Sequence, residues 1–310
     1  MDLFAQPAGV PLKEAGSFIP APGGSSANVA VALARLGLEV GFIGLVGDDP
    51  FGLLFTDLLR AEGVDIAHFH RLAGSSTAIA LVASDSPNDQ DFIVHRGAAA
   101  QLGLADLNRA YITSAEILVC GSMTLSEAGQ GPALRAAVTW ANEEGVLVAY
   151  DANLRPMLWE SLDAARKGIL AGMRGVSICK VNKIELELLA GTKDLATGSR
   201  WILSQGPRLC LVTLGRDGAY FNNGRTEGHV PGFKADEVDS TGCGDAFLAG
   251  AILGFLEARL SLEDLDELSL YRLVRFANAA GALTAAGSGA MAALPRRTAV
   301  ERLLSEHQEI

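Results

Sequence analysis

The segment DSTGCGDAFLAG, residues 239–250, combines a glycine-rich turn with an acidic residue at the start of an apolar helix. Glycines at Gly242 and Gly244, on either side of Cys243, let consecutive backbone N–H groups point at one place, and such a nest binds anions. The positive end of the helix dipole adds to this potential. Asp245 lies where its carboxylate could accept the proton of an attacking hydroxyl. The segment therefore suits transfer of a phosphoryl group to a hydroxyl.

Asp245 also has a simpler interpretation, because Asp is a common helix N-cap. The glycine nest before it and a second acid, Asp239, favour the chemical interpretation. The helix N-terminus is expected to keep Asp245 ionised, as a base requires. The same position predicts a lowered pKa and high reactivity for the Cys243 thiol.

A second glycine-rich segment, PGGSSANVAVALARLG at residues 22–37, opens a helix that is almost entirely apolar. Such a helix should be buried. Gly23 and Gly24 let a ligand approach the backbone, and Asn28 in the first turns could bond hydroxyl groups. A glycine turn that simply leads into a core helix explains the same residues.

The elements that must position these segments alternate between short apolar strands and helices. Strands are expected in five apolar runs, at residues 40–47, 116–121, 146–153, 176–182 and 209–215. Strands separated by helices predict a parallel sheet with helices on both faces, which is an α/β fold of three layers, α/β/α. Ligands in such sheets bind at the C-terminal strand ends, where these runs place polar or glycine residues: Gly121, Asp151, Asn153, Asn182 and Gly215.

Two further strands, 77–84 and 91–96, flank the turn-rich sequence SPNDQ and predict a hairpin that does not fit the parallel pattern. We interpret it as part of a small β lid formed by residues 5–22 and 71–97. No linker divides the chain, so residues 1–310 are expected to form a single domain that carries this lid.

The composition excludes several classes of partner. The net charge is −11 and the sequence pI about 4.9, without a basic cluster, which argues against a nucleic-acid or membrane partner. The four cysteines lack metal-site spacing, and no signal peptide or long apolar run is present, so a cytoplasmic protein is expected.

The two glycine-rich segments together resemble the paired signatures of the ribokinase-like, or PfkB, carbohydrate kinase family. The resemblance covers residues from about 2 to 300. The stretches DANLRPMLW (151–159) and FANAAGALTAAG (276–287) resemble the fructokinase branch in particular. The family resemblance implies an ATP-dependent kinase that uses Mg²⁺ and phosphorylates a sugar hydroxyl.

By this resemblance Asp245 is the catalytic base, and the backbone of Gly242, Cys243 and Gly244 forms the anion hole. The implied sugar-binding residues are Asp2, Gly23, Gly24, Asn28, Arg96 and Arg155. Most of the strand that usually precedes the sugar-binding Asp is missing before Asp2. For the arginines, exposed side chains without a ligand are the alternative.

The resemblance assigns the nucleotide side to Asn182, Glu185, Thr213, Gly215, Gly218 and Asn278. Asn182 and Glu185 match an N-x-x-E motif near Mg²⁺ and the phosphates, although a surface pair at a helix start has the same spacing. A plain strand-to-hairpin turn would explain TLGRDG (213–218), and a helix surface position would explain Asn278. A monovalent cation site, K⁺ being the expected ion, is implied at Asp239, Thr241, Thr284, Gly287 and Gly289.

Fructose is the first expectation for the sugar, followed by 2-keto-3-deoxygluconate, ribose and a nucleoside. A homodimer through the lid is compatible with the resemblance. A sugar- or nucleotide-binding protein without catalysis is one competing hypothesis. A nicotinamide-dependent oxidoreductase is another, but Gly242 and Gly244 are followed by Phe247 where the dinucleotide fingerprint has Gly or Ala.

Overall fold

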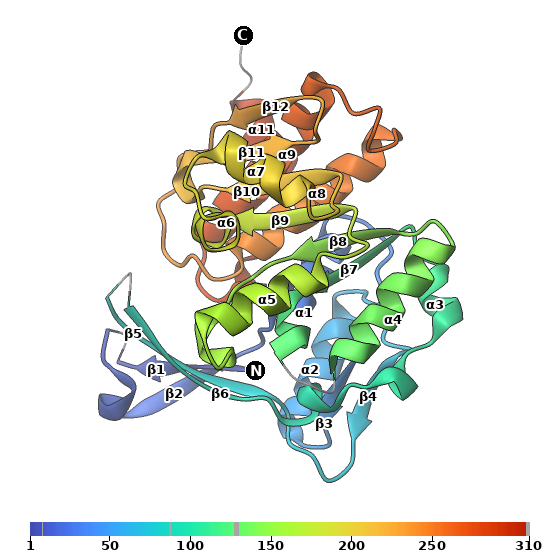
Figure 1. Cartoon of the computed structure of the whole chain (residues 1–310). Helices are drawn as coiled ribbons and strands as arrows, with labels where there is room; N and C mark the ends of the chain where they lie inside the picture. The colour runs from blue at the N-terminus through green and yellow to red at the C-terminus, as the bar shows by residue number, and fades with distance from the viewer. Residues whose placement is uncertain (8, 87–88, 127–129, 308–310) are drawn as a thin grey trace.

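The computed structural model describes residues 1–310 apart from 8, 87–88, 127–129 and 308–310. A six-stranded sheet in the order β12-β11-β10-β9-β8-β7 forms its centre (Figure 1). Strands β7 (Ile117–Gly121), β8 (Leu147–Asp151), β9 (Ile178–Asn182) and β10 (Leu209–Thr213) run parallel, as four of the apolar runs predict. Strands β11 (Ala219–Asn222) and β12 (Glu227–Val230) add an antiparallel edge.

Alternate side chains of the central strands enter two separate cores, because successive residues of a strand point to opposite faces. In β10, Leu209 and Leu211 belong to one hydrophobic cluster, whereas Cys210 and Val212 belong to the other. The first cluster includes residues from α1 (Ser25–Arg35), α2 (Pro50–Ala61), α8 (Cys243–Ala258), α9 (Glu267–Ala285) and α11 (Arg297–Glu306). The second includes residues from α3 (Arg109–Thr113), α4 (Gln130–Glu143), α5 (Leu162–Gly172), α6 (Lys183–Ala190) and α7 (Leu195–Leu203). The predicted three-layer α/β/α architecture is confirmed.

The first predicted run, residues 40–47, forms a shorter strand than expected. Only β3 (Gly44–Gly47) is extended, and it pairs in parallel with β4 (Phe69–Leu72) in a separate two-stranded sheet. Upstream of it, Gly41 makes only an isolated bridge to Asp65. Residues 71–72 therefore belong to this small sheet and not to the lid.

The lid is a four-stranded sheet in the order β2-β1-β5-β6, and it projects from the layered body at the lower left of Figure 1. It consists of β1 (Asp2–Gln6), β2 (Ser17–Ala21), β5 (Ile79–Ser86) and β6 (Asp89–His95). The predicted hairpin is present as the antiparallel pair β5 and β6, with part of its SPNDQ turn, residues 87–88, outside the described residues. Because β1 pairs with β5, the lid joins the two chain segments that were assigned to it.

Two glycines of α8 explain how this helix reaches its position. A Cβ at Gly250 would lie 2.9 Å from the Ala277 Cα, and one at Gly254 would lie 3.1 Å from the Leu273 Cα. Only glycine lets α8 pack this closely along α9. In the described parts of the chain, no helix is both long enough and apolar enough to cross a membrane.

Candidate active site

The two glycine-rich signatures meet at Asp245. Ser25 donates a hydrogen bond from its hydroxyl to Asp245 Oδ1 at 2.8 Å, and Asn28 donates one from Nδ2 to Oδ2, also at 2.8 Å. These residues lie in the first turns of α1 and α8, which pack against each other. Asp245 is 7% exposed. A buried carboxylate is therefore fixed where two helices begin.

Burial is the main influence on the pKa of Asp245. Burial, followed by the negative charge of Asp151, raises its pKa to about 6, while bonds from Asn28 and Ser25 and the charge of Lys180 oppose the rise. Desolvation of the charged form raises this pKa, yet a value of about 6 leaves Asp245 ionised at neutral pH, as the sequence analysis expected. A general base is most effective when its pKa lies near the working pH, and a pKa of about 6 meets this condition.

Four further polar residues complete the network around Asp245. The sequence analysis placed Asp151 and Asn153 at the ligand-binding strand ends, and it did not single out Ser25 and Lys180. Asn153 donates from Nδ2 to the Ser25 hydroxyl at 2.6 Å and from its backbone N–H to Asp151 at 3.1 Å. Its φ of 33° is in the left-handed region, which Asn tolerates better than most residues. A lysine inside the apolar run 176–182 was the available signal for Lys180, since lysine is almost never fully buried unless paired.

The predicted anion hole lies at the N-terminus of α8. Gly242 caps the helix with a left-handed φ of 84°. A Cβ there would be 3.3 Å from the Ala290 Cα, so the loop and α10 (Ala290–Ala293) approach closely. The predicted reactive thiol is wrong: burial, with the charges of Asp239, Glu237 and Asp245, raises the pKa of Cys243 to about 12.

On the predicted sugar side, Asp2 and Gly23 are in direct contact. A Cβ at Gly23 would lie 1.9 Å from Asp2 Oδ2, so the carboxylate occupies the space that glycine leaves free. Gly24 caps α1 with a φ of 126°. Asn28 Oδ1 is buried and has no hydrogen-bond partner among the described residues. Such an acceptor is suited to a hydroxyl group of a ligand.

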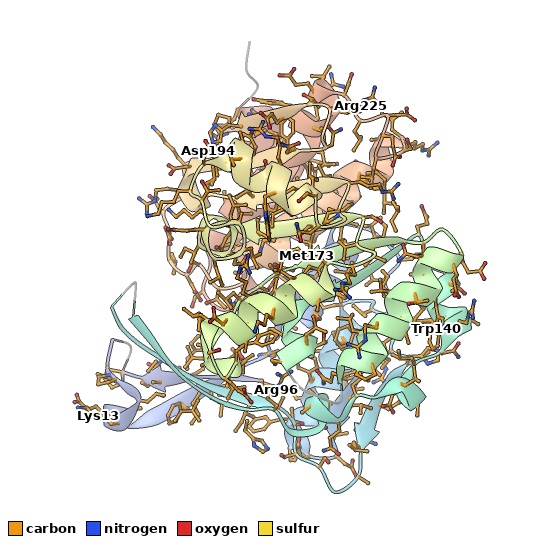
Figure 2. The ribbon with its side chains drawn as sticks, viewed as in Figure 1. Lys13, Arg96, Trp140, Met173, Asp194 and Arg225 are labelled. Atoms are coloured by element: carbon orange, nitrogen blue, oxygen red, sulfur yellow. The ribbon has the colours of Figure 1, made fainter. Side chains whose placement is uncertain are left out.

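The two arginines differ in their surroundings. Arg155 is exposed. Burial raises the pKa of Asp2, and the positive charges of the N-terminus and of Arg155 oppose that rise. Arg96 follows β6 at the junction of lid and body, where Figure 2 labels it. Its guanidinium donates to the Ser126 hydroxyl and, at 3.0 Å, to the Met123 carbonyl oxygen. Arg96 therefore links the lid to the segment that follows β7.

Asn182 and Glu185 form a capping box at the start of α6. The Asn182 side chain accepts from the N–H groups of Ile184 and Glu185, and Glu185 accepts from the N–H of Asn182 at 2.7 Å. The second Glu185 oxygen accepts from the N–H of Leu154, also at 2.7 Å. Glu185 is 1% exposed, which rules out a surface pair.

The other predicted nucleotide residues lie near the ends of β10 and β12. Thr213 ends β10, and Gly215 begins the turn that follows. A Cβ at Gly218 would lie 2.1 Å from the Val230 carbonyl oxygen. Asn278 is buried, not on a helix surface, and donates to the carbonyl oxygens of Val230 and Pro231 at 3.0 and 3.1 Å.

The predicted cation loop is assembled around Asp239. Its carboxylate accepts from the N–H of Thr241 at 2.9 Å and from the N–H of Gly289 at 3.1 Å, which joins the two chain segments. Thr284 is poorly suited to be a ligand. Its carbonyl oxygen already accepts from the N–H groups of Ala286 and Gly287, and its hydroxyl donates to Ala280.

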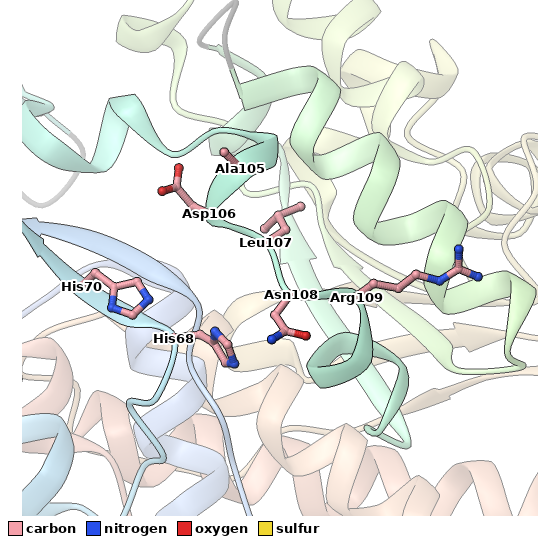
Figure 3. Close-up of a pocket in the computed structure, with 7 residues that line it drawn as sticks. All are labelled: His68, His70, Ala105, Asp106, Leu107, Asn108 and Arg109. Carbon is pink, nitrogen blue, oxygen red and sulfur yellow. The ribbon is translucent and has the colours of Figure 1, made fainter.

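A separate surface pocket of about 480 Å³ is lined by His68, by His70 in β4, and by residues 105–109 (Figure 3). None of the predicted site residues lines it. Its Asp106 carboxylate caps Gly103, and its Arg109 pairs with Glu143. Within the described residues, no group of three or more His, Cys, Asp or Glu side chains could hold a metal ion.

Comparison with known proteins decides the family. The profile of pfkB family carbohydrate kinases matches residues 1–297. The chain belongs to the pfkB family. It is 38% identical over 309 residues to fructokinase-1 of Oryza sativa subsp. japonica, covering 98% of this chain and 94% of that protein.

Two solved structures are similar to this pfkB family chain throughout. The fructokinase of Xylella fastidiosa with bound ATP has a TM-score of 0.88 and 30% identity, over 99% of this chain and 96% of that one. The fructokinase of Vibrio cholerae O395 bound to fructose, ADP and calcium has a TM-score of 0.85 and 30% identity, over 98% and 96%. The ribokinase-like fold and the resemblance to fructokinases are confirmed.

Proposed function

We propose that the protein is an ATP-dependent sugar kinase, and that its sugar is fructose. The observation that carries the proposal is the buried carboxylate of Asp245 between the starts of α1 and α8, next to the glycine nest 242–244. The fructokinase relatives and their structures with ATP or fructose support the reaction and the substrate.

In this proposal Asp245 takes the proton of a sugar hydroxyl while the hydroxyl oxygen attacks the γ-phosphorus of ATP. The bond between that phosphorus and the bridging oxygen breaks, and its electron pair leaves with ADP. Backbone N–H groups of residues 242–244 stabilise the charge on the transferring group. Asp2 and Asn28, whose Oδ1 atom is unpartnered, orient the sugar.

Magnesium fits the site in the manner usual for kinases, held by substrate phosphates, water and one or two carboxylates. Glu185, buried at the C-terminal edge of the sheet, would supply a carboxylate, and the ion would neutralise phosphate charge. A potassium ion beside Asp239, Thr241, Gly287 and Gly289 would support the anion hole from behind. The hydrogen bonds of Asp239 that join residues 241 and 289 support this position.

Asp245 and the glycine nest 242–244 lie together at the start of α8, which supports catalysis over a binding protein without catalysis. ADP release with Mg-ATP should be measured against fructose, 2-keto-3-deoxygluconate, ribose and adenosine, each with and without K⁺. We expect turnover with fructose and stimulation by K⁺. Faster turnover of another sugar would replace fructose, and tight ATP binding without any turnover would favour the binding protein.

We propose that the kinase domain spans the chain and dimerises through its lid. Four apolar side chains are exposed on two lid strands, Phe18 and Ile19 on β2 and Ile93 and Val94 on β6. By the strand register Ile19 and Val94 lie on one face of the lid and Phe18 and Ile93 on the other, and exposed apolar residues on a sheet face mark contact surfaces. We also propose a cytoplasmic location, since all four cysteines are free, as in a reducing compartment.

A further inference from the structure

Lys180 is a buried cation beside the proposed catalytic base. It lies in β9 and is 5% exposed. Its Nζ donates to both oxygens of Asp151 in the neighbouring strand β8, at 3.0 and 3.2 Å. Among the described residues Lys180 is the only cationic side chain classed as buried. Burying a lysine costs desolvation free energy, which is offset only when its ammonium group is paired with a negative charge.

The same ammonium group contacts the proposed anion hole. A Cβ at Gly244 would lie 2.8 Å from Lys180 Nζ, so the lysine fills the space that this glycine leaves open. An ammonium group has three N–H donors, and Asp151 accepts from Nζ with its two oxygens. Positive charge is therefore located directly against the backbone of the first turn of α8.

The groups that face Asp245 come from four elements besides α8. Asp151 from β8 raises the pKa of Asp245, and Lys180 from β9 opposes that rise. Ser25 and Asn28 from α1 donate hydrogen bonds. Glu185 from α6 adds a further buried acid that interacts with Lys180, and Cys243 precedes Asp245 in α8. Three buried carboxylates thus share one ammonium group.

We infer that Lys180 is a positioning residue of the kinase reaction: its ammonium group neutralises Asp151, leaves Asp245 to act as the base, and supplies positive charge behind the anion hole. This inference rests on the proposed function. Asp151 is held as a counter-ion because both its oxygens are paired with Nζ. Among the described residues, Asp245 accepts side-chain hydrogen bonds from a hydroxyl and an amide, so its carboxylate can take up a proton without breaking an ion pair.

The decisive variant is Lys180→Met, which keeps the unbranched stem of the side chain, one atom shorter, and removes its charge. The acidic limb of kcat/KM against pH should move upward by about one pH unit or more, because Asp245 loses a nearby opposite charge. At pH 7, kcat/KM should fall at least tenfold. Lys183→Met, at an exposed position three residues later, is the matched control and should leave both quantities unchanged.

A second pair of variants covers the case in which Lys180→Met leaves Asp151 unpaired and does not fold. Asp151→Asn is compared with Asp151→Asn/Lys180→Met, where no buried charge pair is broken in the second step. Adding Lys180→Met should again move the limb upward and lower kcat/KM. The inference would be overturned if Lys180→Met changed neither the acidic limb nor kcat/KM, both in the wild-type chain and on the Asp151→Asn background. A lysine with a merely structural role would change stability alone.

A readout without turnover separates this inference from the kinase proposal. The ¹³C shift of the Asp245 carboxyl, assigned with Asp245→Asn, can be followed against pH in the complete chain. We expect its midpoint to rise in Lys180→Met or, on the Asp151→Asn background, in the double variant. An unchanged midpoint would refute the inference even in an active kinase, whereas a wild-type chain that phosphorylates no sugar would refute only the proposed function.

Discussion

The burial of Asp245 gives the reaction a specific pH dependence. Because Asp245 must be ionised to accept a proton and its pKa is raised to about 6, activity is present above that value and is lost as pH falls through it. We expect kcat/KM to decline about tenfold per pH unit below pH 6, as for a single protonation. Initial rates between pH 5 and 8, with circular dichroism as a check on folding, measure this limb. Constant activity down to pH 5 would exclude Asp245 as the base.

Gly23 tests the contact between the start of α1 and the sugar side. In Gly23→Ala the new methyl group would collide with the Asp2 carboxylate, which lies 1.9 Å from the Cβ position. Displacing Asp2 should raise KM for the sugar about tenfold or more, as expected when a hydrogen bond to a charged group is lost. KM for ATP should change little. Equal effects on both substrates would contradict the assignment of Asp2.

At the residue scale, sequence reasoning succeeds where a motif has its own backbone signature. The glycines around Asp245 and before Asn28 predicted both helix starts. It missed Lys180 and did not foresee the partners of Asn153, because these contacts arise only when β8 and β9 pair and α1 approaches. It also predicted the wrong direction for the Cys243 pKa, since burial and neighbouring acids do not appear in the local sequence.

The element that carries Ser25 and Asn28 is anchored at its opposite end. Arg35, the last residue of α1, pairs with Glu62 through two hydrogen bonds of 2.9 and 2.6 Å. It also donates to the carbonyl oxygens of Met291 and Leu294, the first of which lies in α10. Arg35 thus fastens α1 to the C-terminal segment that closes the cation loop.

Replacing Arg35 should destabilise the fold. Arg35→Met leaves Glu62 without its main partner, and the side chain of Glu62 is only 16% exposed. The free energy of unfolding should fall by about 2–4 kcal/mol, somewhat less than for a fully buried ion pair that loses one partner. Thermal unfolding measures the change. Lys13→Met is the control, because its pair with Glu14 is exposed; a similar Tm in both variants would contradict the prediction.

At the element scale, apolar runs separated by helical stretches predicted β7 to β10, and two further strand-like segments predicted the lid hairpin. The run 40–47 was predicted too long. Its apolar residues Val40 and Phe42 pack against the core without strand pairing beyond an isolated bridge at Gly41. Hydrophobicity alone does not distinguish a buried loop from a strand.

At the scale of the whole molecule, the lid should act as an interface between two copies of the chain. Ile19 and Val94 are 55% and 37% exposed, and the strand register places them on the same face of the lid. Ile19→Glu/Val94→Glu places charges on that face and should convert a dimer to a monomer, measured by analytical ultracentrifugation. Leu268→Glu, at an exposed position at the start of α9, is the control. A wild-type monomer, or a dimer unaffected by the lid variant, would refute the proposed interface.

The fold and the order of the two signatures were predictable from the sequence, because both depend on local patterns that also mark the pfkB family. The grouping of the buried carboxylates was not predictable from the sequence. Asp151, Glu185 and Asp245 are far apart in the chain and converge only at the C-terminal edge of the sheet. The charge balance that governs the proposed base is therefore a property of the tertiary structure.

The most direct test of the account compares ADP release from Mg-ATP and fructose by the wild-type chain and by Asp245→Asn, which keeps the size of the side chain. We predict turnover by the wild type and a loss of kcat of about 10²–10⁴-fold in the variant, the usual contribution of a general base. Both proteins should show the same circular dichroism and bind ATP equally. A folded Asp245→Asn variant with wild-type kcat would contradict the central claim.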